Sequence, residues 1–374
     1  MQTTTTESTV STGTALSTPV LEQQVARSTS AEADGGEAKR KRLVGLLRGY
    51  FASPVIATLG EMGLADRMLE GDFSVADWNH ISRPEIVVAL FNYLHSIGLL
   101  TKRNAAEYTL TPDGRTAIGR NGAFSLLMSY ADYLHQLPNI FAGEDSKPTV
   151  NRLRNVRGSG QLHNKKFFPD AFNFFSSDPP SAIIDIGCGD GCFLDHAQER
   201  WPELSVFGVD LSETAVETTK NRLRRLNSSD SIAVAANGHD VAIWSKAAPE
   251  IVRNSPRLVI SLWFVAHEFS DGSPERIHSF FSALRRTFPQ AQVVLGEISN
   301  ISPDLLAEDH DLSIMPEFLL FHELSRQGVL PWATWQQILG EIPYALKSER
   351  RFDEVRSGSG ESIPASFLWL LQPK

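Results

Sequence analysis

One ten-residue stretch constrains the fold of this chain more than any other. Residues 182–191 read Ala-Ile-Ile-Asp-Ile-Gly-Cys-Gly-Asp-Gly, an apolar run followed by three glycines at alternate positions, and a helix-compatible segment begins at Cys192. A buried strand that ends in a glycine turn and continues as a helix lets the backbone approach a ligand closely, because glycine has no Cβ. The stretch therefore predicts the ligand-binding strand–turn–helix unit of an α/β fold.

The next segment indicates a nucleoside ligand. A short apolar strand over residues 204–209 ends at Asp210, an acid about twenty positions past the turn, where nucleoside-binding units place a carboxylate for ribose hydroxyls. The spacing Asp-x-Gly-x-Gly-x-Gly differs from the dinucleotide fingerprint G-x-G-x-x-G. Asp190 inside the turn would repel a pyrophosphate and attract a cationic amino-acid group. The pattern therefore favours a cofactor with an amino-acid part over a dinucleotide.

The motifs Asp185-Ile-Gly-Cys-Gly-Asp-Gly191 and Gly208-Val-Asp-Leu-Ser212 resemble the first two motifs of class I S-adenosylmethionine-dependent methyltransferases. The resemblance implies that the glycine turn holds the methionine part of the cofactor and that Asp210 holds the ribose. Asp240, after the expected third strand, is the candidate partner of the adenine amino group. The expected cofactor site comprises Asp185, Gly187, Gly189, Gly191, Asp210, Leu211, Gly238 and Asp240.

The chain from residue 151 to residue 374 alternates apolar runs with helical patterns, as a parallel sheet requires. The expected strands lie near residues 182–186, 204–209, 231–236, 257–262, 291–297, 345–352 and 365–372. The last two would form the reversed hairpin edge of the methyltransferase fold. The predicted fold class is therefore α/β, with a Rossmann-like seven-stranded methyltransferase domain. Gly158-Ser-Gly160, before this sheet, reads as a hinge leading into a helix that could cover the cofactor.

The N-terminal part of the chain predicts a tail and a second domain. Residues 1–38 are rich in Thr, Ser, Ala and Glu and are expected to be disordered. Residues 39–150 contain two helical patterns, over 43–68 with a restart at Pro54 and over 84–100, and then two short strands that end in the turn Thr111-Pro-Asp-Gly114. This order is typical of a mostly helical, winged-helix-like domain.

The same order resembles the N-terminal dimerisation domain of small-molecule O-methyltransferases, which implies a homodimer through residues 40–120. A winged-helix DNA-binding regulator is the alternative from another class. Residues 84–97 carry no Lys or Arg, and the formal net charge of −9 gives no general reason to expect nucleic-acid binding. A small-molecule substrate is therefore the expected partner.

Composition indicates a cytoplasmic protein. No apolar run reaches the ~18 residues that a membrane helix needs, and the N-terminus has no signal-peptide pattern. The two cysteines, Cys188 and Cys192, lie in or next to the glycine turn, where small buried thiols are expected rather than a disulfide. We therefore expect neither a membrane span nor an oxidising compartment.

Two strand ends supply candidate catalytic residues, since ligands bind outside the carboxyl ends of parallel strands. The fourth strand is followed by Trp263-Phe-Val-Ala-His267-Glu-Phe, and the fifth ends at Glu297. The first segment is similar to one in plant-type O-methyltransferases, in which a histidine deprotonates a phenol. The resemblance makes His267 the candidate base, and imidazole suits that role because its pKa lies near neutrality. Glu268-Phe269 departs from the Asp-Trp that follows the histidine in those enzymes.

A second histidine, His322, lies on a mostly apolar helix that begins near Pro316. A core histidine is the simpler interpretation. His267 and His322, with nearby carboxylates, could instead hold a divalent or ferric metal, iron or zinc, on which a 2-oxo acid chelates. This arrangement resembles the 2-oxo acid C-methyltransferases that make β-methylated amino-acid precursors of bacterial peptide natural products. The expected reaction is then methylation at C3 of a 2-oxo acid, and O-methylation of a phenol is the alternative.

The sequence does not determine which side chain the 2-oxo acid carries. Aromatic residues near the expected domain junction suit phenylpyruvate. The acidic cluster Glu308, Asp309 and Asp311 would suit a cationic side chain such as that of 5-guanidino-2-oxopentanoate, because guanidinium pairs bidentately with carboxylates. A solvated acidic loop is the simpler interpretation of this cluster.

Overall fold

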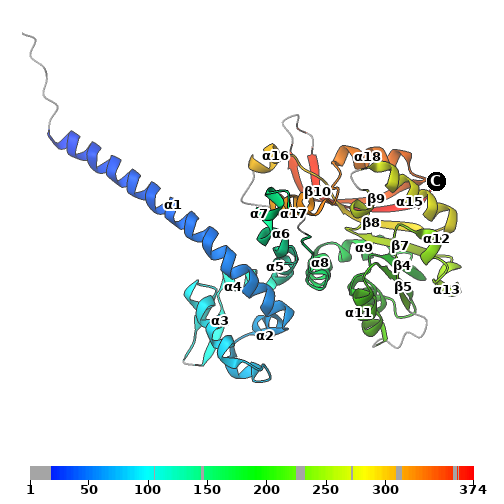
Figure 1. The fold of residues 1–374 in the computed structure, drawn as a ribbon, viewed down its shortest axis with the longest axis horizontal. Coiled ribbons are helices and arrows are strands. Elements are labelled where there is room, and N and C mark those ends of the chain that lie inside the picture. The colour runs from blue at the N-terminus through cyan, green and yellow to red at the C-terminus, as the bar shows by residue number, and fades with distance from the viewer. Residues whose placement is uncertain are drawn as a thin grey trace, which may run out of the picture. The chain divides into compact units, whose positions relative to one another are not determined.

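The structure is a computed structural model that describes residues 18–374, apart from 105, 145–146, 225–231, 271–272, 309–313, 357–359 and 361. The side chains of residues 18–35 and of Glu308 are not described. The chain divides into two compact units, residues 1–53 and 54–374, which are described separately (Figure 1).

The first unit is the N-terminal part of a long helix. Helix α1 spans Thr18–Glu61 and so includes residues 18–38, for which the sequence predicts disorder. Ala, Glu and Gln are frequent in this segment, and all three are strong helix formers. Pro54 lies inside α1 instead of starting a new helix.

Part of α1 has the length and composition of a membrane-spanning helix. The stretch Gly36–Glu61 is long and apolar enough to cross a bilayer by length and composition. No membrane-spanning run is predicted from the sequence, but the mean hydropathy of this stretch is high because Arg48 is the only charged residue between 43 and 60. A helix that packs against protein passes the same test, so this property by itself assigns no span.

The second unit begins with a small helical region that contains a three-stranded sheet. Its strands β1 (Phe73–Ser74), β2 (Leu100–Lys102) and β3 (Glu107–Leu110) pair in the order β1-β3-β2, all antiparallel. The predicted hairpin is therefore present. Edge-to-face packing of the Phe91 ring against Phe73, Trp78 and Tyr108, at centroid distances of 5.1–5.3 Å, forms its core.

Short helices precede and follow these strands along the chain. Thr111 does not end a turn but caps a helix, since its hydroxyl accepts a hydrogen bond from the Gly114 N–H at 3.0 Å. The helices, with the 3-10 turn η1, are α2 (Leu64–Glu70), η1 (Val75–Trp78), α3 (Pro84–Ser96), α4 (Pro112–Gly119), α5 (Asn121–Met128), α6 (Ala131–His135) and α7 (Leu137–Phe141).

Helix α8 (Arg152–Lys166) is continuous, and the predicted hinge at Gly158-Ser-Gly160 is wrong. The glycine at 158 serves a helix crossing: a Cβ there would lie 2.5 Å from the backbone N of Leu126 on α5. Because Gly158 has no side chain, the backbones of α8 and α5 can pack closely at this point. Helix α9 (Phe168–Phe174) follows directly.

The rest of the unit is a seven-stranded sheet in the order β6-β5-β4-β7-β8-β10-β9, in which β10 runs antiparallel to both of its neighbours. All seven predicted strands are present, and the reversed hairpin edge is confirmed. The strands are β4 (Ala182–Ile186), β5 (Ser205–Asp210), β6 (Ile232–Ala235), β7 (Leu258–Trp263), β8 (Gln292–Ile298), β9 (Tyr344–Arg356) and β10 (Ser362–Pro373).

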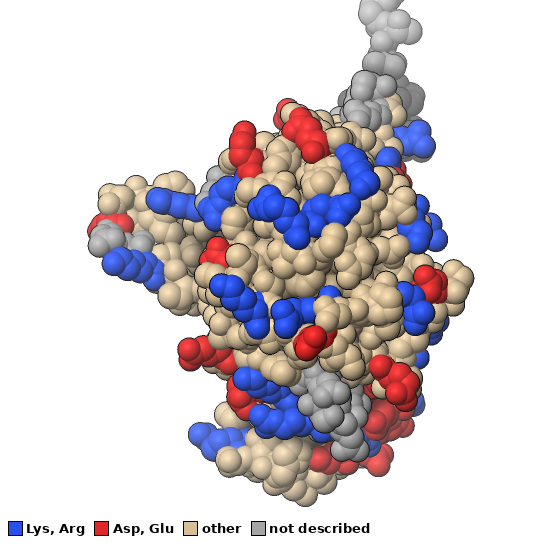
Figure 2. All heavy atoms as spheres, turned by 90° about the vertical axis from the view of Figure 1, so that its right-hand side faces the viewer, with Lys and Arg blue, Asp and Glu red and all other residues tan. Residues whose placement is uncertain are grey.

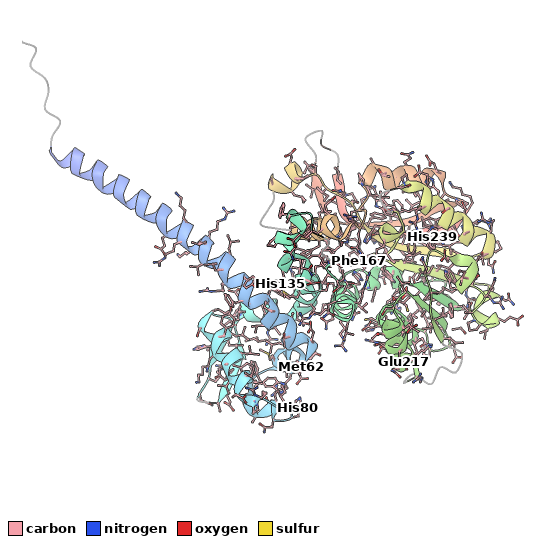
Figure 3. The ribbon with its side chains drawn as sticks, in the orientation of Figure 1. Met62, His80, His135, Phe167, Glu217 and His239 are labelled. Atoms are coloured by element: carbon pink, nitrogen blue, oxygen red, sulfur yellow. The ribbon has the colours of Figure 1, made fainter. Side chains whose placement is uncertain are left out.

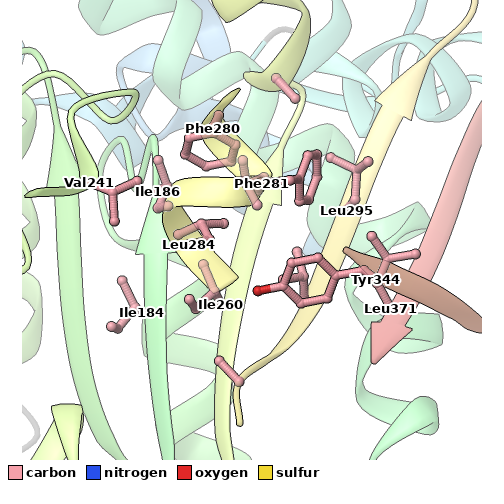
Figure 4. Packing of buried hydrophobic residues seen from close by; sticks show 14 of the residues in the cluster. Ile184, Ile186, Val241, Ile260, Phe280, Phe281, Leu284, Leu295, Tyr344 and Leu371 are labelled. Atoms are coloured by element: carbon pink, nitrogen blue, oxygen red, sulfur yellow. The ribbon is translucent and has the colours of Figure 1, made fainter. Parts of the chain in front are cut away.

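Helices cover both faces of this sheet, because alternate strand residues point to opposite sides. One buried cluster joins Ile183 and Val206 to Phe168 on α9 and Leu194 on α10 (Cys192–Arg200). The other joins Ile184 and Ile260 to Phe280, Phe281 and Leu284 on α15 (Pro274–Thr287), and Figure 4 shows these side chains between strand and helix. Its helices are α12 (Val241–Trp244), α13 (Glu250–Arg253), α15 (Pro274–Thr287) and α18 (Trp332–Glu341).

The first face is covered by α9, α10 (Cys192–Arg200) and α11 (Glu213–Arg224). Three further helices, α14 (Ala266–Ser270), α16 (Pro303–Glu308) and α17 (Met315–Ser325), follow the carboxyl ends of β7 and β8. On the face shown in Figure 2, basic and acidic side chains are intermixed.

Candidate active site

A cavity of about 500 Å³ lies at the carboxyl ends of the parallel strands. Residues that follow β4, β5, β6 and β7 line it, in agreement with the rule that places ligands outside these strand ends. One face of α8 forms its cover, and it presents Arg152, Asn155, Val156, Gly160 and His163 at helical spacing. Of the predicted cofactor residues, all but Gly191 and Asp240 line the cavity.

The turn after β4 has the geometry that its glycines predict. Gly187, Gly189 and Gly191 all have positive φ, between 57° and 77°, a conformation that residues with a Cβ rarely adopt. A Cβ on Gly189 would lie 2.8 Å from Cγ1 of Val156, the residue of α8 that covers the turn. The glycines therefore allow both the turn and the close approach of α8.

Two carboxyl groups of the predicted cofactor site lie at strand ends. Asp185 is buried, and its Oδ1 accepts a hydrogen bond from the Ser261 hydroxyl at 2.6 Å. Burial raises the pKa of Asp185 to about 8, although that hydrogen bond lowers it. Asp210 accepts hydrogen bonds from the N–H groups of Gly189 at 2.9 Å and Ser212 at 2.8 Å, which couples the second strand end to the glycine turn.

Asp190 does not present a free carboxylate to the cavity. Nη2 of Arg222 on α11 lies 2.6 Å from its Oδ2, and the same guanidinium contacts Asp195 at 3.1 Å. Asp190 is therefore not expected to exclude a pyrophosphate, because Arg222 neutralises its charge. Cys188 and Cys192 are free thiols, as expected, and burial raises the pKa of Cys192 to about 12.

The loop after β6 forms another wall of the cavity. Asn237, Gly238 and His239 line it, whereas Asp240 does not and keeps a half-exposed carboxylate at the start of α12. Figure 3 labels His239, which packs edge-on against Phe269, another lining residue. The role of Asp240 toward adenine stays a prediction, and Asn237 and His239 are lining residues that were not predicted from the sequence.

An aromatic wall lies at the far end of α8. The His163 ring stacks on Phe264 with centroids 4.3 Å apart and an interplanar angle of 16°, and Phe167, labelled in Figure 3, packs against both. Burial lowers the pKa of His163 to about 3, so this ring is neutral at physiological pH. Phe264 has a φ of 56°, an unusual conformation for a bulky residue and one that concentrates at functional sites.

His267 and Glu297 form a buried pair. Oε1 of Glu297 accepts from Nδ1 of His267 at 2.8 Å, and its Oε2 accepts from the His267 backbone N–H at 3.0 Å. Burial lowers the pKa of His267, but the charge and hydrogen bond of Glu297 outweigh it, so the pKa is raised above its ordinary value. The two residues come from the ends of β7 and β8, as the sequence predicts.

His322 lies beside His267. The two ring centroids are 5.0 Å apart at an interplanar angle of 65°, and Nδ1 of His322 donates to the backbone O of Phe318 at 2.7 Å. Burial and the neighbouring His267 lower the pKa of His322 to about 3. The fold thus brings together two histidines that are far apart in the sequence, and His322 is buried with a backbone partner, as the interpretation of a core histidine predicts.

The histidine pair borders the cavity without lining it. Glu268, next to His267, is the lining residue, and it contacts Gln327 at 3.2 Å and Arg152 at 3.9 Å. Among the described residues, no group of three or more His, Cys, Asp or Glu side chains could hold a metal ion. The acidic cluster Glu308, Asp309 and Asp311 lies outside the described side chains.

Comparison with known proteins defines the class. Residues 161–335 match the family described as a methyltransferase domain. A malonyl-[acyl-carrier protein] O-methyltransferase of Paenibacillus sp. (strain JDR-2) is 33% identical over 67 residues, which are 18% of this chain and 23% of that protein. The chain thus spans less than a quarter of that relative.

Two relatives match over most of their length. The 2-ketoarginine methyltransferase of Streptomyces arginensis is 22% identical over 85% of this chain and 92% of its own. The methyltransferase ungE' of Aspergillus campestris (strain IBT 28561) is 23% identical over 68% of this chain and 74% of its own.

Solved structures share the fold. An O-methyltransferase family protein from Burkholderia thailandensis superposes with a TM-score of 0.56 at 16% identity, covering 89% of this chain and 97% of its own. Human N-acetylserotonin methyltransferase, solved with S-adenosylmethionine, gives a TM-score of 0.55 at 14% identity over 89% and 97% of the two chains.

The fold, the glycine-turn cavity and these matches define an S-adenosylmethionine-dependent methyltransferase. More particularly, it is a two-part chain in which a mostly helical N-terminal region precedes the Rossmann-like methyltransferase domain.

Proposed function

We propose that this methyltransferase acts on carbon, at C3 of a 2-oxo acid, and makes a precursor of a β-methyl amino acid. The observation that carries the proposal is the buried pair of His267 and His322, whose ring centroids are 5.0 Å apart. Each Nδ1 already has an acceptor, the Glu297 carboxylate or the Phe318 carbonyl. In its neutral form each imidazole therefore keeps its Nε2 lone pair available to a ligand.

This pattern fits a metal ion, iron or zinc. Metal-binding histidines usually donate their other N–H to a carboxylate or a backbone carbonyl, as His267 and His322 do here. With two protein ligands, the remaining positions would belong to the oxo acid and to water. When bound, the metal would polarise the keto oxygen of the acceptor and make the hydrogen atoms on C3 more acidic.

The chain's own residues supply the remaining requirements of methyl transfer. The glycine turn and Asp210 orient the cofactor, and Glu297 fixes the ring of His267. C3 first gives a proton to solvent water, the resulting enolate carbon attacks the methyl group, the methyl–sulfur bond breaks, and its electron pair stays on sulfur. Closely held reactants and exclusion of water favour such a displacement.

O-methylation of a phenol is the second candidate. The His267–Glu297 pair has the arrangement of a general base and its orienting carboxylate, and the solved neighbours include O-methyltransferases such as mitomycin 7-O-methyltransferase, with a TM-score of 0.54. His322 has no role in that chemistry. We therefore favour the carbon acceptor.

The surroundings of His322 bear on the acceptor's side chain. Phe318 lies 4.1 Å from the His322 ring, and Tyr130, stacked on Phe321 at 4.9 Å, lies 6.3 Å from it. Such aromatic surroundings favour an oxo acid of the phenylpyruvate type. The relative named as a 2-ketoarginine methyltransferase keeps 5-guanidino-2-oxopentanoate as the second oxo acid to test.

Metal analysis together with a His322→Phe variant tests the proposal. We expect purified protein to contain iron or zinc, and we expect both the metal and the methylation of phenylpyruvate to be lost in the variant. Glu323→Gln, an exposed change on the same helix, is the control. Metal-free wild type, insensitivity to a chelator and an active His322→Phe variant would together favour O-methylation.

We also propose a cytoplasmic homodimer. Within α1, large apolar side chains lie exposed at helical spacing, and a second copy of the chain is the occupant that we propose for this face. They are Leu43, Leu46, Leu47, Tyr50 and Phe51. Sedimentation of the wild type and of Leu46→Glu should give a dimer and a monomer, whereas wild type that sediments as a monomer or partitions into membranes would overturn the proposal.

A further inference from the structure

Helix α8 makes different contacts with its two faces. One face lines the cavity, and its Val156 and Gly160 lie against the glycine turn and the residue that follows it. On the opposite face, residues 154, 158, 161 and 165 recur at helical spacing and contact the N-terminal helical region, residues 54–150. The helix therefore connects that region to the cofactor site.

The second face of α8 packs closely. Gly158 forms the crossing with α5, and a Cβ on Gly122 of α5 would lie 2.7 Å from Cβ of Gln161. One turn after Gln161, Nζ of Lys165 donates a hydrogen bond to the backbone O of Gly119 at 2.7 Å. A glycine on each helix thus allows an approach in which a small shift of α8 would change many contacts.

Arg154 makes the charged contact of this face. Its Nε lies 2.7 Å from Oε1 of Glu61, the last residue of α1, and its Nη2 lies 3.1 Å from Oε2. The two side chains are 28% and 18% exposed, and the Ser125 hydroxyl on α5 donates to the same carboxylate at 3.2 Å. A guanidinium that meets a carboxylate through two N–H groups is fixed in both position and orientation. The pair therefore ties α8 to α1 and α5 at one point.

The order of charges in this pair opposes both helix dipoles. Glu61 ends α1 and Arg154 lies in the first turn of α8, whereas acidic residues stabilise the N-terminus of a helix and basic residues its C-terminus. Each helix by itself would be more stable with the opposite charge. The contact between the helices explains the pair, and the stability of either helix does not.

We propose that Arg154 is a positioning residue for S-adenosylmethionine. None of the described residues before Arg152 lines the cavity, and Arg154 does not line it either. With Glu61, Arg154 holds α8 at the distance from the glycine turn at which the cavity fits the cofactor. The inference needs only the methyltransferase class and is independent of the methyl acceptor.

Binding of the cofactor without any acceptor tests the proposal. S-adenosylmethionine is titrated calorimetrically into the wild type, Arg154→Gln, Glu61→Gln, Arg154→Lys and the doubly reversed variant Glu61→Arg with Arg154→Glu. Arg157 is exposed on the same helix and does not line the cavity, so Arg157→Gln is the matched loss of charge. Urea unfolding of each protein measures stability separately.

We expect Arg154→Gln and Glu61→Gln each to raise the Kd of S-adenosylmethionine by about 3- to 10-fold, because α8 is no longer held at one distance. Arg154→Lys keeps the charge but loses the two parallel contacts, so its Kd should lie between. The doubly reversed variant should return to within about twofold of the wild type, because the Ser125 hydroxyl accepts as well as donates. Arg157→Gln should match the wild type.

A wild-type Kd in Arg154→Gln, together with a lower free energy of unfolding, would overturn the proposal, because the pair would then only stabilise the fold. A doubly reversed variant that binds as weakly as the single variants would overturn it as well, since the loss would not come from the pair. Where a Gln variant does not fold, an unchanged Kd in Arg154→Lys has the same meaning.

Discussion

Nδ1 of His267 lies 2.8 Å from Oε1 of Glu297, and both side chains are almost completely buried, at 2% and 0% exposure. Glu297 also accepts the backbone N–H groups of His267 and Ile298. A buried carboxylate with this many donors is fixed in place, and it fixes the imidazole in turn. The pair is therefore prepared for either chemistry, as an oriented base or as an oriented metal ligand.

Glu297→Gln tests that role. The amide retains the shape and one acceptor oxygen but loses the charge that raises the pKa of His267. The neutral imidazole is the active form, so the acid limb of the pH–rate profile should move to lower pH. We expect kcat/KM at neutral pH to fall about 10- to 100-fold. An unchanged acid limb would show that His267 does not control it.

Asp210→Ala tests the ribose assignment. Asp210 organises the Gly189 N–H and lines the cavity, so we expect the Kd of S-adenosylmethionine to rise at least about tenfold, the loss of a charged hydrogen bond. Asp240→Asn, measured by the same calorimetry, tests the adenine role of a carboxylate that does not line the cavity. Unchanged affinity in Asp210→Ala would remove the ribose assignment.

The sheet and the cofactor turn could be predicted because their signals are local. Strand β4 is a continuous apolar run that ends at glycine, and its predicted and observed bounds agree. Strand β9 extends well beyond its predicted range to Arg356, because its exposed residues carry charges that resemble a loop. The charged segment that follows Phe352 is a strand only because it pairs with β10.

The residues of α8 that cover the cavity could not be predicted, because their positions depend on contacts between elements that are distant in the sequence. Arg152 and His163 face the cavity only because α8 packs closely on α5 through Gly158, which the sequence presents as a hinge. The pairing of Asp190 with Arg222 joins residues on a turn and on a later helix. No spacing rule connects such residues.

Gly189→Ala tests the close approach of α8 to the turn. The new methyl group would lie 2.8 Å from Cγ1 of Val156, at a φ of 57°. We expect weaker cofactor binding and a loss of about 1–3 kcal/mol in the free energy of unfolding, from strain and contact together. Val156→Ala added to this variant should restore part of the loss, since it relieves the contact and leaves the strain. No recovery in urea unfolding would mean that the backbone conformation alone is responsible.

The lowered pKa of His163 should make the free energy of unfolding sensitive to acid. Its pKa is about 3 in the folded protein, below the ordinary value near 6.5. The unfolded chain therefore binds more protons between these values, and stability falls as the pH drops below about 6.5. In His163→Phe this contribution is absent. The loss of unfolding free energy between pH 7 and pH 5 should be about 2 kcal/mol smaller than in the wild type, as measured by urea unfolding. An identical loss in both proteins would place the acid sensitivity elsewhere.

The position of the transferred methyl group tests the central claim most directly. Wild-type protein is incubated with phenylpyruvate and S-adenosylmethionine labelled with ¹³C in its methyl group, and the product is examined by nuclear magnetic resonance. We expect a methyl signal split by the single proton on C3, because the methyl group lies on carbon. An unsplit methyl signal on oxygen, from the enol of phenylpyruvate, would contradict the account.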